Sequence, residues 1–321
     1  MNNPNTQAGP REIDIAIIGG GPAGMAAGLY AARALRSTVL FEGGVLGGQI
    51  ATSDRVENYP GFPEGIGGFE LAMAFHQQSE HHGMETVYAM VSSLEQAEDG
   101  RFRLGTEGGG DFLAKAVIVT AGANPNKLGI PGETELTGKG VSYCATCDAA
   151  FFKGMEVAVV GGGDAAVEEA LFTTRYASKV YLIHRREELR AQAVLQERAR
   201  AAENLEFIWD TVVEEVDGGS AVTGEVEKLK LRNVKTGEQS ELAVKALFIF
   251  IGQTPNSNLL EGMVELDAGK HACVNAWMET PVPGLYVAGD VRADAARQVV
   301  SSAGDGATAA IRADHYISDH F

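Results

Sequence analysis

Short apolar runs alternate with longer alanine-rich segments along this chain, a pattern typical of buried strands joined by helices in an α/β protein. The run at 13–18 leads through a glycine-rich turn into a helix-length segment at 23–35, and a second apolar run follows at 37–41. The same order of strand, glycine turn, helix and strand recurs at 155–183. The chain therefore carries an internal repeat of one βαβ unit, spaced too widely for a solenoid.

The remaining pattern divides the chain into two regions. Short strands in antiparallel order are predicted at 86–113, followed by a buried strand at 116–120. Alternating strands at 207–247 lead into another buried strand at 246–251. Both buried strands end in turns that contain glycine, asparagine and proline, so we place the domain boundaries at these two turns.

Composition limits the choice of function. The chain has 26 Lys and Arg against 43 Asp and Glu, a net charge of −17, which argues against nucleic acid as a partner because phosphate binding needs a basic face. No apolar run is long enough to cross a membrane, and the first residues lack the pattern of a secretory signal. With three cysteines in all, a reducing cytoplasm is the predicted compartment.

The first glycine turn has the spacing of a dinucleotide-binding motif. Gly19, Gly21 and Gly24 form G-x-G-x-x-G between a strand and a helix, where backbone N–H groups can approach a diphosphate. The next strand ends at Glu42, about 20 residues further on, and an acid at this place suits a ribose with a free 2′-hydroxyl. The turn therefore predicts FAD or NAD as its ligand.

The second glycine turn, at 161–166, predicts a different ligand. Where the first copy has an acid, the second has His-Arg-Arg at 184–186, and Arg190 follows. Guanidinium groups bind a 2′-phosphate through charge-assisted hydrogen bonds, whereas a carboxylate would repel it. We therefore predict NADP at this copy. The alternative is that the arginines are the solvated start of a charged helix at 189–202.

Two of the three cysteines, Cys144 and Cys147, have a C-x-x-C spacing, and Asp148 follows the second directly. Such motifs lower the thiol pKa so that a reactive thiolate forms near neutral pH, and a neighbouring carboxyl can supply a proton. One alternative is half of a zinc site, completed by ligands such as His271 and Cys273; another is a structural disulfide. We interpret the pair as a redox dithiol.

Taken in order, the motifs resemble the low-molecular-weight, bacterial-type thioredoxin reductases over nearly the whole chain. The pieces that carry the resemblance are GGGPAG (19–24), GGQ (47–49), VENYPG (56–61), CATCD (144–148), GGGDAAVEEA (161–170), HRREELR (184–190) and GDV with RQ (289–291 and 297–298). Their joint occurrence is highly specific. The cysteine pair also precedes the second glycine turn, whereas relatives of glutathione reductase carry theirs in the first domain.

The resemblance implies an α/β fold of two doubly wound, three-layer nucleotide-binding domains, the second inserted into the first. Residues 1–124 and 252–321 would bind FAD, and residues 125–251 would bind NADPH and carry the cysteine pair. It also implies a cytoplasmic homodimer without metal, in which electrons pass from NADPH through FAD and the cysteine disulfide to thioredoxin. In this family Cys147 would face the flavin, Asp148 would be the acid, and Cys144 would attack the disulfide of thioredoxin.

The family's cofactor contacts carry over where this sequence matches its motifs. The residues predicted to contact FAD are Gly19, Gly21, Pro22, Ala23, Gly24, Glu42, Gly48, Gln49, Asn58, Gly289, Asp290, Arg297, Gln298 and Val299. The residues predicted to contact NADPH are Gly161, Gly163, Asp164, Ala165, Ala166, His184, Arg185, Arg186 and Arg190.

Other functions stay open at this point. Some relatives take electrons from ferredoxin, but these typically lack the second glycine turn and the arginine cluster, and this chain has both. A non-catalytic, redox-sensing flavoprotein would not need its cysteines. The terminal Phe321 could stack on the flavin and block a nicotinamide, although an ordinary frayed end is the favoured interpretation.

Overall fold

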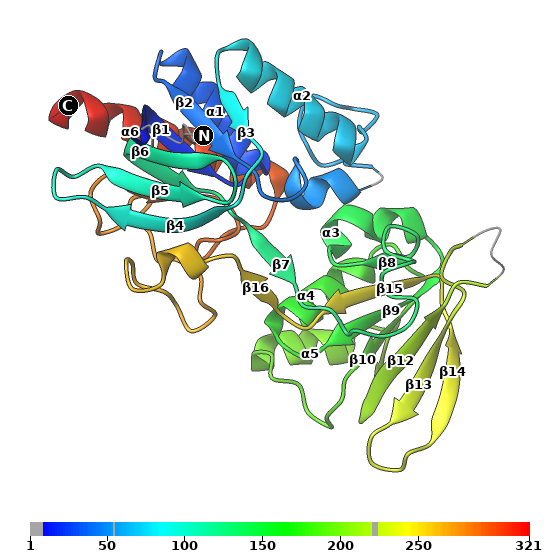
Figure 1. Cartoon of the computed structure of the whole chain (residues 1–321). Helices are drawn as coiled ribbons and strands as arrows, with labels where there is room; N and C mark the ends of the chain where they lie inside the picture. The colour runs from blue at the N-terminus through cyan, green and yellow to red at the C-terminus, as the bar shows by residue number, and fades with distance from the viewer. Residues whose placement is uncertain (1–8, 54, 220–223) are drawn as a thin grey trace, which may run out of the picture. The chain divides into compact units, whose positions relative to one another are not determined.

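The computed structural model describes residues 9–53, 55–219 and 224–321 (Figure 1). The chain divides into two compact units. Unit 1 consists of Met1–Asn124 and Thr254–Phe321, and unit 2 consists of Pro125–Gln253. Unit 1 is therefore built from both ends of the chain, and unit 2 is inserted between them.

The chain passes between the units at two short strands, β7 (Ala123–Pro125) and β16 (Gln253–Pro255), which pair with each other in a two-stranded sheet. The sequence predicts the return to the first domain at residue 252. Unit 1 resumes at Thr254, within β16, and the exact domain boundary stays a prediction.

Unit 1 is built on a mostly parallel sheet. Its strand order is β3-β2-β1-β6-β5-β4, with β17 paired to the last residues of β6. The strands β1, β2, β3, β6 and β17 run parallel, and β5 and β4 form an antiparallel edge. The bounds are β1 (Arg11–Ile18), β2 (Thr38–Phe41), β3 (Glu85–Val87), β4 (Val91–Gln96), β5 (Phe102–Thr106), β6 (Gly110–Val119) and β17 (Leu285–Val287).

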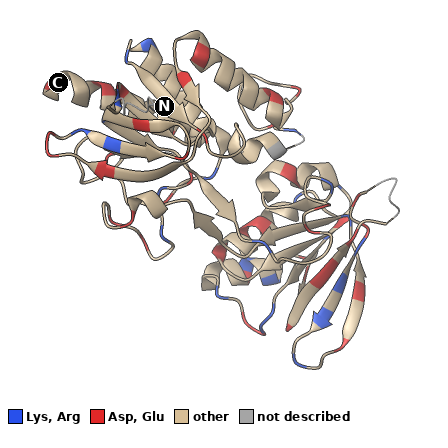
Figure 2. Cartoon of the chain, in the orientation of Figure 1, with Lys and Arg blue, Asp and Glu red and all other residues tan. Residues whose placement is uncertain are grey.

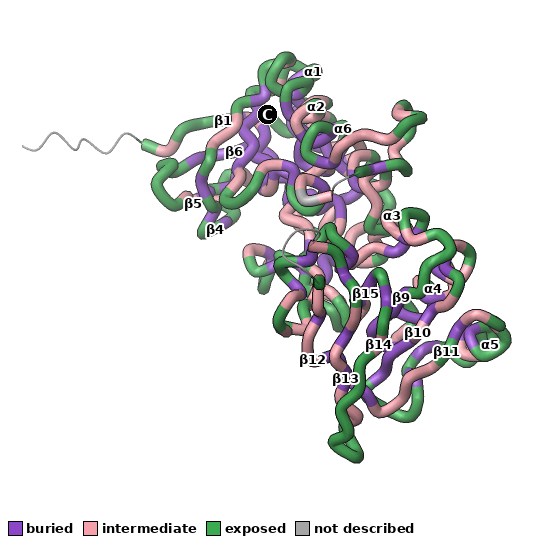
Figure 3. The backbone as a smooth tube through the Cα atoms, turned by 90° about the vertical axis from the view of Figure 1, so that its right-hand side faces the viewer, coloured by how far each residue is buried: buried purple, intermediate pink, exposed green. Residues whose placement is uncertain are grey.

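Helices cover this sheet and bury its central strands (Figure 3). The helix α1 (Pro22–Arg33) packs against both α2 (Gly68–His81) and α6 (Val299–His320). Small side chains permit the close approach of α1 and α6, since Ala27 and Ala309 are fully buried in the same cluster. Two 3-10 turns complete the unit, η1 (Gly48–Thr52) and η3 (Asn258–Leu260).

Two expectations for unit 1 are wrong. The sequence predicts antiparallel order from residue 86 onward, but β3 pairs in parallel with β2, Val39 lying opposite Glu85. A strand of three residues is too short for its pattern to show its direction. The C-terminal end is not frayed either, since α6 continues to His320 and the backbone N–H of Phe321 still donates to Ile317 O at 3.0 Å.

The ring of Phe321 lies far from the first glycine turn, where a flavin dinucleotide would bind. The ring packs edge-on against Tyr316 and lies 5.9 Å from Nζ of Lys115, which is paired with Asp14 near the start of β1. The glycine turn follows the other end of β1. With 22 residues, α6 is about 33 Å long. Within its own chain, Phe321 therefore lies away from the carboxyl ends of the strands, where the glycine turn is found.

Unit 2 contains a five-stranded sheet in the order β11-β10-β9-β15-β8, with every neighbouring pair parallel. Its strands are β8 (Val141–Ser142), β9 (Glu156–Gly161), β10 (Lys179–Ile183), β11 (Leu205–Ile208) and β15 (Ala246–Phe250). Its helices are α3 (Ala145–Asp148), α4 (Asp164–Thr173) and α5 (Ala193–Ala201), with a 3-10 turn η2 (Ala149–Phe152).

The start of α5 corrects a prediction. The sequence predicts a helix over 189–202, but α5 begins only at Ala193. The preceding residues turn back onto the second glycine turn, where Arg190 N donates to Gly162 O at 2.7 Å and Gln192 N donates to Oδ1 of Asp164 at 2.7 Å. These bonds replace the helical ones.

A second, antiparallel sheet of three strands completes unit 2: β12 (Thr211–Asp217), β13 (Lys228–Asn233) and β14 (Gln239–Ala243). Basic side chains of β13 pair with acids on its neighbours, as Figure 2 shows by their alternating colours. Lys228 lies 2.9 Å from Glu241, and Lys230 lies 2.8 Å from Glu215. Because these pairs are exposed to water, each adds little to stability. Among the described residues, no helix of either unit is long and apolar enough to cross a membrane.

Candidate active site

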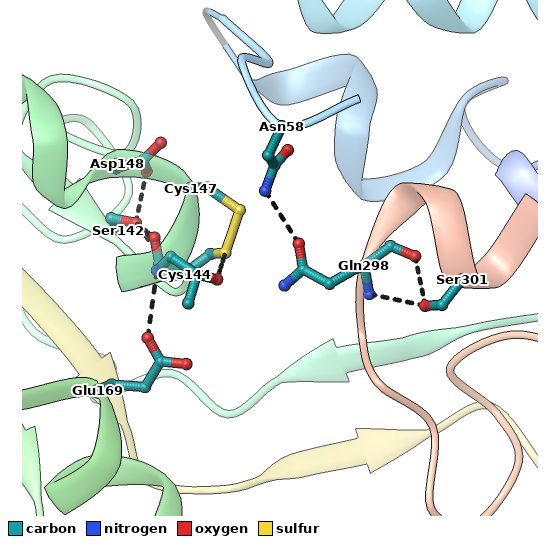
Figure 4. The surroundings of a disulfide bond; sticks show 9 residues. Asn58, Ser142, Cys144, Cys147, Asp148, Glu169, Gln298 and Ser301 are labelled. Atoms are coloured by element: carbon teal, nitrogen blue, oxygen red, sulfur yellow. Dashed lines mark hydrogen bonds between the residues drawn. A yellow bond between two sulfur atoms is a disulfide. The ribbon is translucent and has the colours of Figure 1, made fainter. Parts of the chain in front are cut away.

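The cysteine pair lies directly after β8, at the edge of the parallel sheet of unit 2. Cys144 and Cys147 form a disulfide with Cα atoms 5.3 Å apart (Figure 4). Residues Ala145–Asp148 form the short helix α3, which keeps the two sulfurs on one side of the turn. Both cysteines are partly exposed, so a disulfide of this kind is accessible to a reaction partner.

Asp148 is held by a serine that the sequence analysis does not single out. The Ser142 hydroxyl donates to Oδ2 of Asp148 at 2.6 Å and accepts from the backbone N–H of Cys144 at 3.1 Å. Ser142 is buried, so water does not compete for these bonds. The signal for it was its place two residues before Cys144, on the strand that presents the motif.

A second carboxylate holds the residues between the cysteines. Oε2 of Glu169, on α4, accepts from the backbone N–H of Thr146 at 3.2 Å (Figure 4). The Thr146 hydroxyl in turn lies 3.4 Å from Sγ of Cys144. Burial raises the pKa of Glu169 above its ordinary value. The sequence does not indicate this contact, because Glu169 lies 23 residues after Thr146 on a different element.

The first glycine turn has the shape that a bound diphosphate requires. Gly19 has φ of +109°, and a Cβ there would lie 2.6 Å from Thr120 O. A Cβ at Gly24 would lie 2.0 Å from Gly19 O, so this glycine permits α1 to pack against the turn. At Gly21, by contrast, a Cβ would meet nothing within 4 Å. The open side at Gly21 is where the backbone can receive a diphosphate, and Pro22 and Ala23 begin the helix behind it.

Glu42 closes this turn from the end of β2. Its Oε2 accepts from Gly20 N at 2.7 Å and its Oε1 accepts from Gly44 N at 2.6 Å. The carboxylate is thereby fixed beside the glycine turn, with lone pairs left over for a hydroxyl group. The residues of this turn therefore fit the dinucleotide half of FAD.

In the C-terminal part of unit 1, several polar side chains lie around the start of α6. Gly289 and Asp290 follow β17, and the Ser302 hydroxyl donates to Oδ1 of Asp290 at 3.2 Å. Burial raises the pKa of Asp290. Gln298 caps α6 and accepts from Nδ2 of Asn58 at 3.0 Å (Figure 4).

The other residues predicted to contact FAD lie on the same unit. Gln49 donates from its amide to Ala123 O and follows Gly48, which has φ of +58°. Arg297 is exposed and adopts φ of +57°, and Val299 is the first residue of α6. That these residues contact FAD stays a prediction.

An ion pair not foreseen from the sequence fixes this segment. Arg292 donates from Nε to Oδ2 of Asp305 at 2.7 Å and from Nη2 to Oδ1 at 3.2 Å, and Gly289 N also donates to Oδ2. The side chains of Arg292 and Asp305 are only 17% and 12% exposed. The pair therefore ties the Gly289–Asp290 turn to α6.

We expect Asp305→Ala to lower the free energy of unfolding by about 3 kcal/mol, because it leaves the largely buried Arg292 charge without its carboxylate and with only the bond to Ala293 O. The measurement is urea unfolding of the FAD-loaded protein. The control is Glu261→Ala, which removes an exposed pair with Lys270 and should cost less than about 1 kcal/mol. Equal losses in the two variants would contradict the role of Asp305.

The second glycine turn repeats the geometry of the first. Gly161 has φ of +151°, and a Cβ there would lie 2.3 Å from Phe250 O. A Cβ at Gly163 would meet nothing within 4 Å, so this turn too has an open side. Asp164 and Ala165 begin α4 on the surface, and Ala166 is fully buried beneath the turn. The turn fits the diphosphate of a second dinucleotide.

His184 packs directly on this turn. A Cβ at Gly162 would lie 2.2 Å from Cε1 of His184, so a glycine is required there, which the spacing of the motif alone does not explain. The imidazole is buried, and its Nε2 has no hydrogen-bond partner in the part of the chain that the structure describes. Burial, assisted by Arg190, lowers the pKa of His184, so the ring is neutral at pH 7 and can bond to a polar ligand.

Three arginines follow β10, and the charges of two of them, Arg186 and Arg190, act on the neighbouring His184. Arg185, Arg186 and Arg190 are exposed, and none forms an ion pair with another described residue. Free guanidinium groups beside an open glycine turn fit the 2′-phosphate of NADP. No acidic partner competes for them among the described residues.

The zinc alternative finds no support in the geometry. Within residues 9–53, 55–219 and 224–321, no group of three or more His, Cys, Asp and Glu could hold a metal ion. Cys273 is a free thiol in unit 1, where burial raises its pKa, while Cys144 and Cys147 lie in unit 2.

Fold and site together define a protein with two dinucleotide-binding folds and a C-x-x-C disulfide. The chain belongs to the pyridine nucleotide-disulphide oxidoreductase family, whose pattern matches residues 13–310. The predicted α/β fold of two nucleotide-binding domains, one inserted into the other, is confirmed by the comparison with solved structures of relatives.

Its similarity to particular relatives extends over nearly the full chain. It is 47% identical to a thioredoxin reductase of Peptoclostridium litorale, over 96% of this chain and 98% of that protein. It is 44% identical to the thioredoxin reductase of Bacillus subtilis, over 95% of each. The crystal structure of thioredoxin reductase from Streptococcus pyogenes matches with a TM-score of 0.91 at 41% identity, covering 97% of this chain and all of that one. The resemblance stated from the motifs is confirmed.

Proposed function

We propose that this protein is a thioredoxin-disulfide reductase that takes electrons from NADPH and passes them through FAD and the Cys144–Cys147 disulfide to thioredoxin. The observation that carries the proposal is the closed disulfide of unit 2, with Asp148 fixed beside it. The same chain has two open glycine turns, the first beside an acid, Glu42, and the second beside exposed arginines. FAD, when bound, accepts a hydride from NADPH and passes two electrons on to the disulfide.

The two units have different cofactor roles in this proposal. Unit 1 binds FAD, because Glu42 beside the first turn suits a ribose hydroxyl. Unit 2 binds NADPH, because the exposed arginines beside the second turn suit a 2′-phosphate. The same arginines and the open turn at Gly163 favour NADPH over ferredoxin as the donor.

The cysteines perform the exchange with the acceptor. When the disulfide has received two electrons, Asp148 supplies a proton to one of the two thiolates. The Cys144 thiolate then attacks one sulfur of the disulfide of thioredoxin, and the other sulfur leaves and takes a proton. The Cys147 thiol gives its proton back to Asp148, and its thiolate attacks Sγ of Cys144 in this mixed disulfide. The bond to thioredoxin breaks, the Cys144–Cys147 bond forms again, and the second thioredoxin sulfur leaves and takes a proton, so that thioredoxin is released as a dithiol.

The test is NADPH oxidation by the FAD-loaded protein with and without a bacterial thioredoxin. Oxidation that requires thioredoxin, and that is far slower with NADH, supports the proposal. No oxidation of NADPH in the presence of thioredoxin, with FAD bound, would contradict it. We place the activity in the cytoplasm, since a reducing compartment suits a chain with one dithiol and one free thiol.

We also infer that the protein is a homodimer, which forms through unit 1. A cavity of about 330 Å³ opens between α1, α2 and α6, and its lining is mainly apolar. Tyr30 and Val300, which line this cavity, are each nearly half exposed, so large apolar side chains lie open to solvent beside an apolar hollow. A second copy of the same face would cover both, as in a closed two-fold dimer.

Val300→Asp should convert the dimer to a monomer, because it places a charge in the apolar contact. Light scattering during gel filtration should give about twice the 33.9 kDa chain mass for the wild type and about one chain mass for the variant. Val194→Asp, an equally exposed valine on α5 of unit 2, should stay dimeric. A wild type of one chain mass would refute the dimer.

A further inference from the structure

Glu169 makes a contact with the redox motif that the proposed electron path does not use. The residue belongs to α4, the helix that begins at the second glycine turn, yet its carboxylate reaches α3. Oε2 accepts from Thr146 N at 3.2 Å, and the N–H of Ala145 is directed at the same carboxylate. The two residues between the cysteines are thus held by one acid (Figure 4).

The contact continues to a sulfur atom. The Thr146 hydroxyl lies 3.4 Å from Sγ of Cys144, so the carboxylate that fixes the Thr146 backbone also fixes the group beside Cys144. The other acid of the motif, Asp148, is bonded to Ser142 instead. Glu169 and Asp148 therefore hold opposite ends of α3.

No positive charge offsets the carboxylate of Glu169. It makes no ion pair with any residue that the structure describes, and the charge that acts on it from α4 is that of Glu168, which is also negative. From α3 the titratable groups are the two cysteines and Asp148. A negative charge in this position opposes the formation of a second one nearby.

We propose that Glu169 is a positioning residue that holds the chain between the cysteines and, through its charge, restrains ionisation of the reduced Cys144 thiol. The inference rests on the proposed function, because it concerns the cysteine that attacks the acceptor. The carboxylate makes the Cys144 thiol less acidic than it would be beside a neutral side chain. Burial raises the pKa of Glu169, while the hydrogen bonds from the backbone N–H groups of Thr146 and Ala145 favour its charged form.

Glu169→Gln separates the effect of the negative charge from that of the hydrogen bond to Thr146 N. The glutamine side chain keeps an oxygen that accepts from Thr146 N, but it removes the negative charge. The variant is made in a Cys147→Ser background, so that Cys144 is a single thiol that needs no reduction. The matched control is Glu168→Gln, which removes the same charge from the neighbouring, exposed position on α4.

The experiment measures the rate of Cys144 alkylation by iodoacetamide between pH 5 and 9 on the FAD-loaded full chain, read by mass spectrometry of the Cys144 peptide. We expect Glu169→Gln to move the midpoint to lower pH and to raise the rate at pH 7 roughly three- to tenfold. Glu168→Gln should leave both nearly unchanged. Far-UV circular dichroism and thermal unfolding check that unit 2 of each variant is folded.

An unchanged midpoint in Glu169→Gln would overturn the inference, and so would an equal shift in Glu168→Gln. The readout needs neither NADPH nor thioredoxin. If the proposed function is wrong, the wild type fails to turn over while the alkylation shift is still measurable. The two failures are therefore distinguishable.

Discussion

Cys147→Ser is expected to abolish thioredoxin-dependent NADPH oxidation, leaving no rate above the background without protein. The variant retains the Cys144 thiol but cannot form the disulfide that closes α3. Without the second sulfur the pair cannot accept two electrons, and a mixed disulfide formed at Cys144 cannot be resolved. The measurement is the loss of NADPH absorbance in the presence of thioredoxin.

The control for this variant is Cys273→Ser. Cys273 is the free cysteine of unit 1, so its replacement should leave the rate within about twofold of the wild type. Both variants should keep bound FAD, because neither cysteine belongs to the first glycine turn. Turnover by Cys147→Ser at a rate close to that of the wild type would remove the disulfide from the electron path.

The second large effect is expected from the triple variant Arg185→Ala, Arg186→Ala and Arg190→Ala. Its kcat/KM for NADPH should fall about 100-fold, or about 2.8 kcal/mol, because charge-assisted bonds to the 2′-phosphate are lost. Its kcat/KM for NADH, which lacks this phosphate, should change less than about threefold. Steady-state kinetics with each nucleotide measures both.

Arg198→Ala supplies the matched control, since Arg198 is an exposed arginine on α5 away from the glycine turn. It should leave both nucleotides unaffected. Equal losses with NADPH and NADH in the triple variant would show that the arginines support the fold of unit 2 rather than recognise the phosphate. An unchanged kcat/KM for both nucleotides would contradict phosphate recognition by these arginines, and ferredoxin would then be the first alternative donor to test.

The sequence predicts those parts of the fold that depend on local pattern. Buried parallel strands are continuous apolar runs, and the glycine turns are short motifs whose steric demands are local. The positive φ of Gly19 and the open side of Gly21 follow from such a motif. For the same reason the family of the chain can be predicted from its short motifs alone.

The features that the sequence does not predict depend on contacts between distant segments. The direction of β3 is set by its pairing with β2, and the start of α5 is set by bonds to Gly162 and Asp164. Glu169 lies on another element than the cysteines, and Arg292 meets Asp305 through the packing of α6. In each case the residue type alone is compatible with an ordinary surface position.

The central claim, that electrons from NADPH reach the Cys144–Cys147 disulfide, is tested most directly by an anaerobic titration of the FAD-loaded protein with NADPH. Flavin and disulfide each accept two electrons, so the wild type should need about two equivalents for full flavin bleaching. The double variant Cys144→Ser and Cys147→Ser should need about one. Equal requirements in the two proteins, or no bleaching by NADPH at all, would contradict the account.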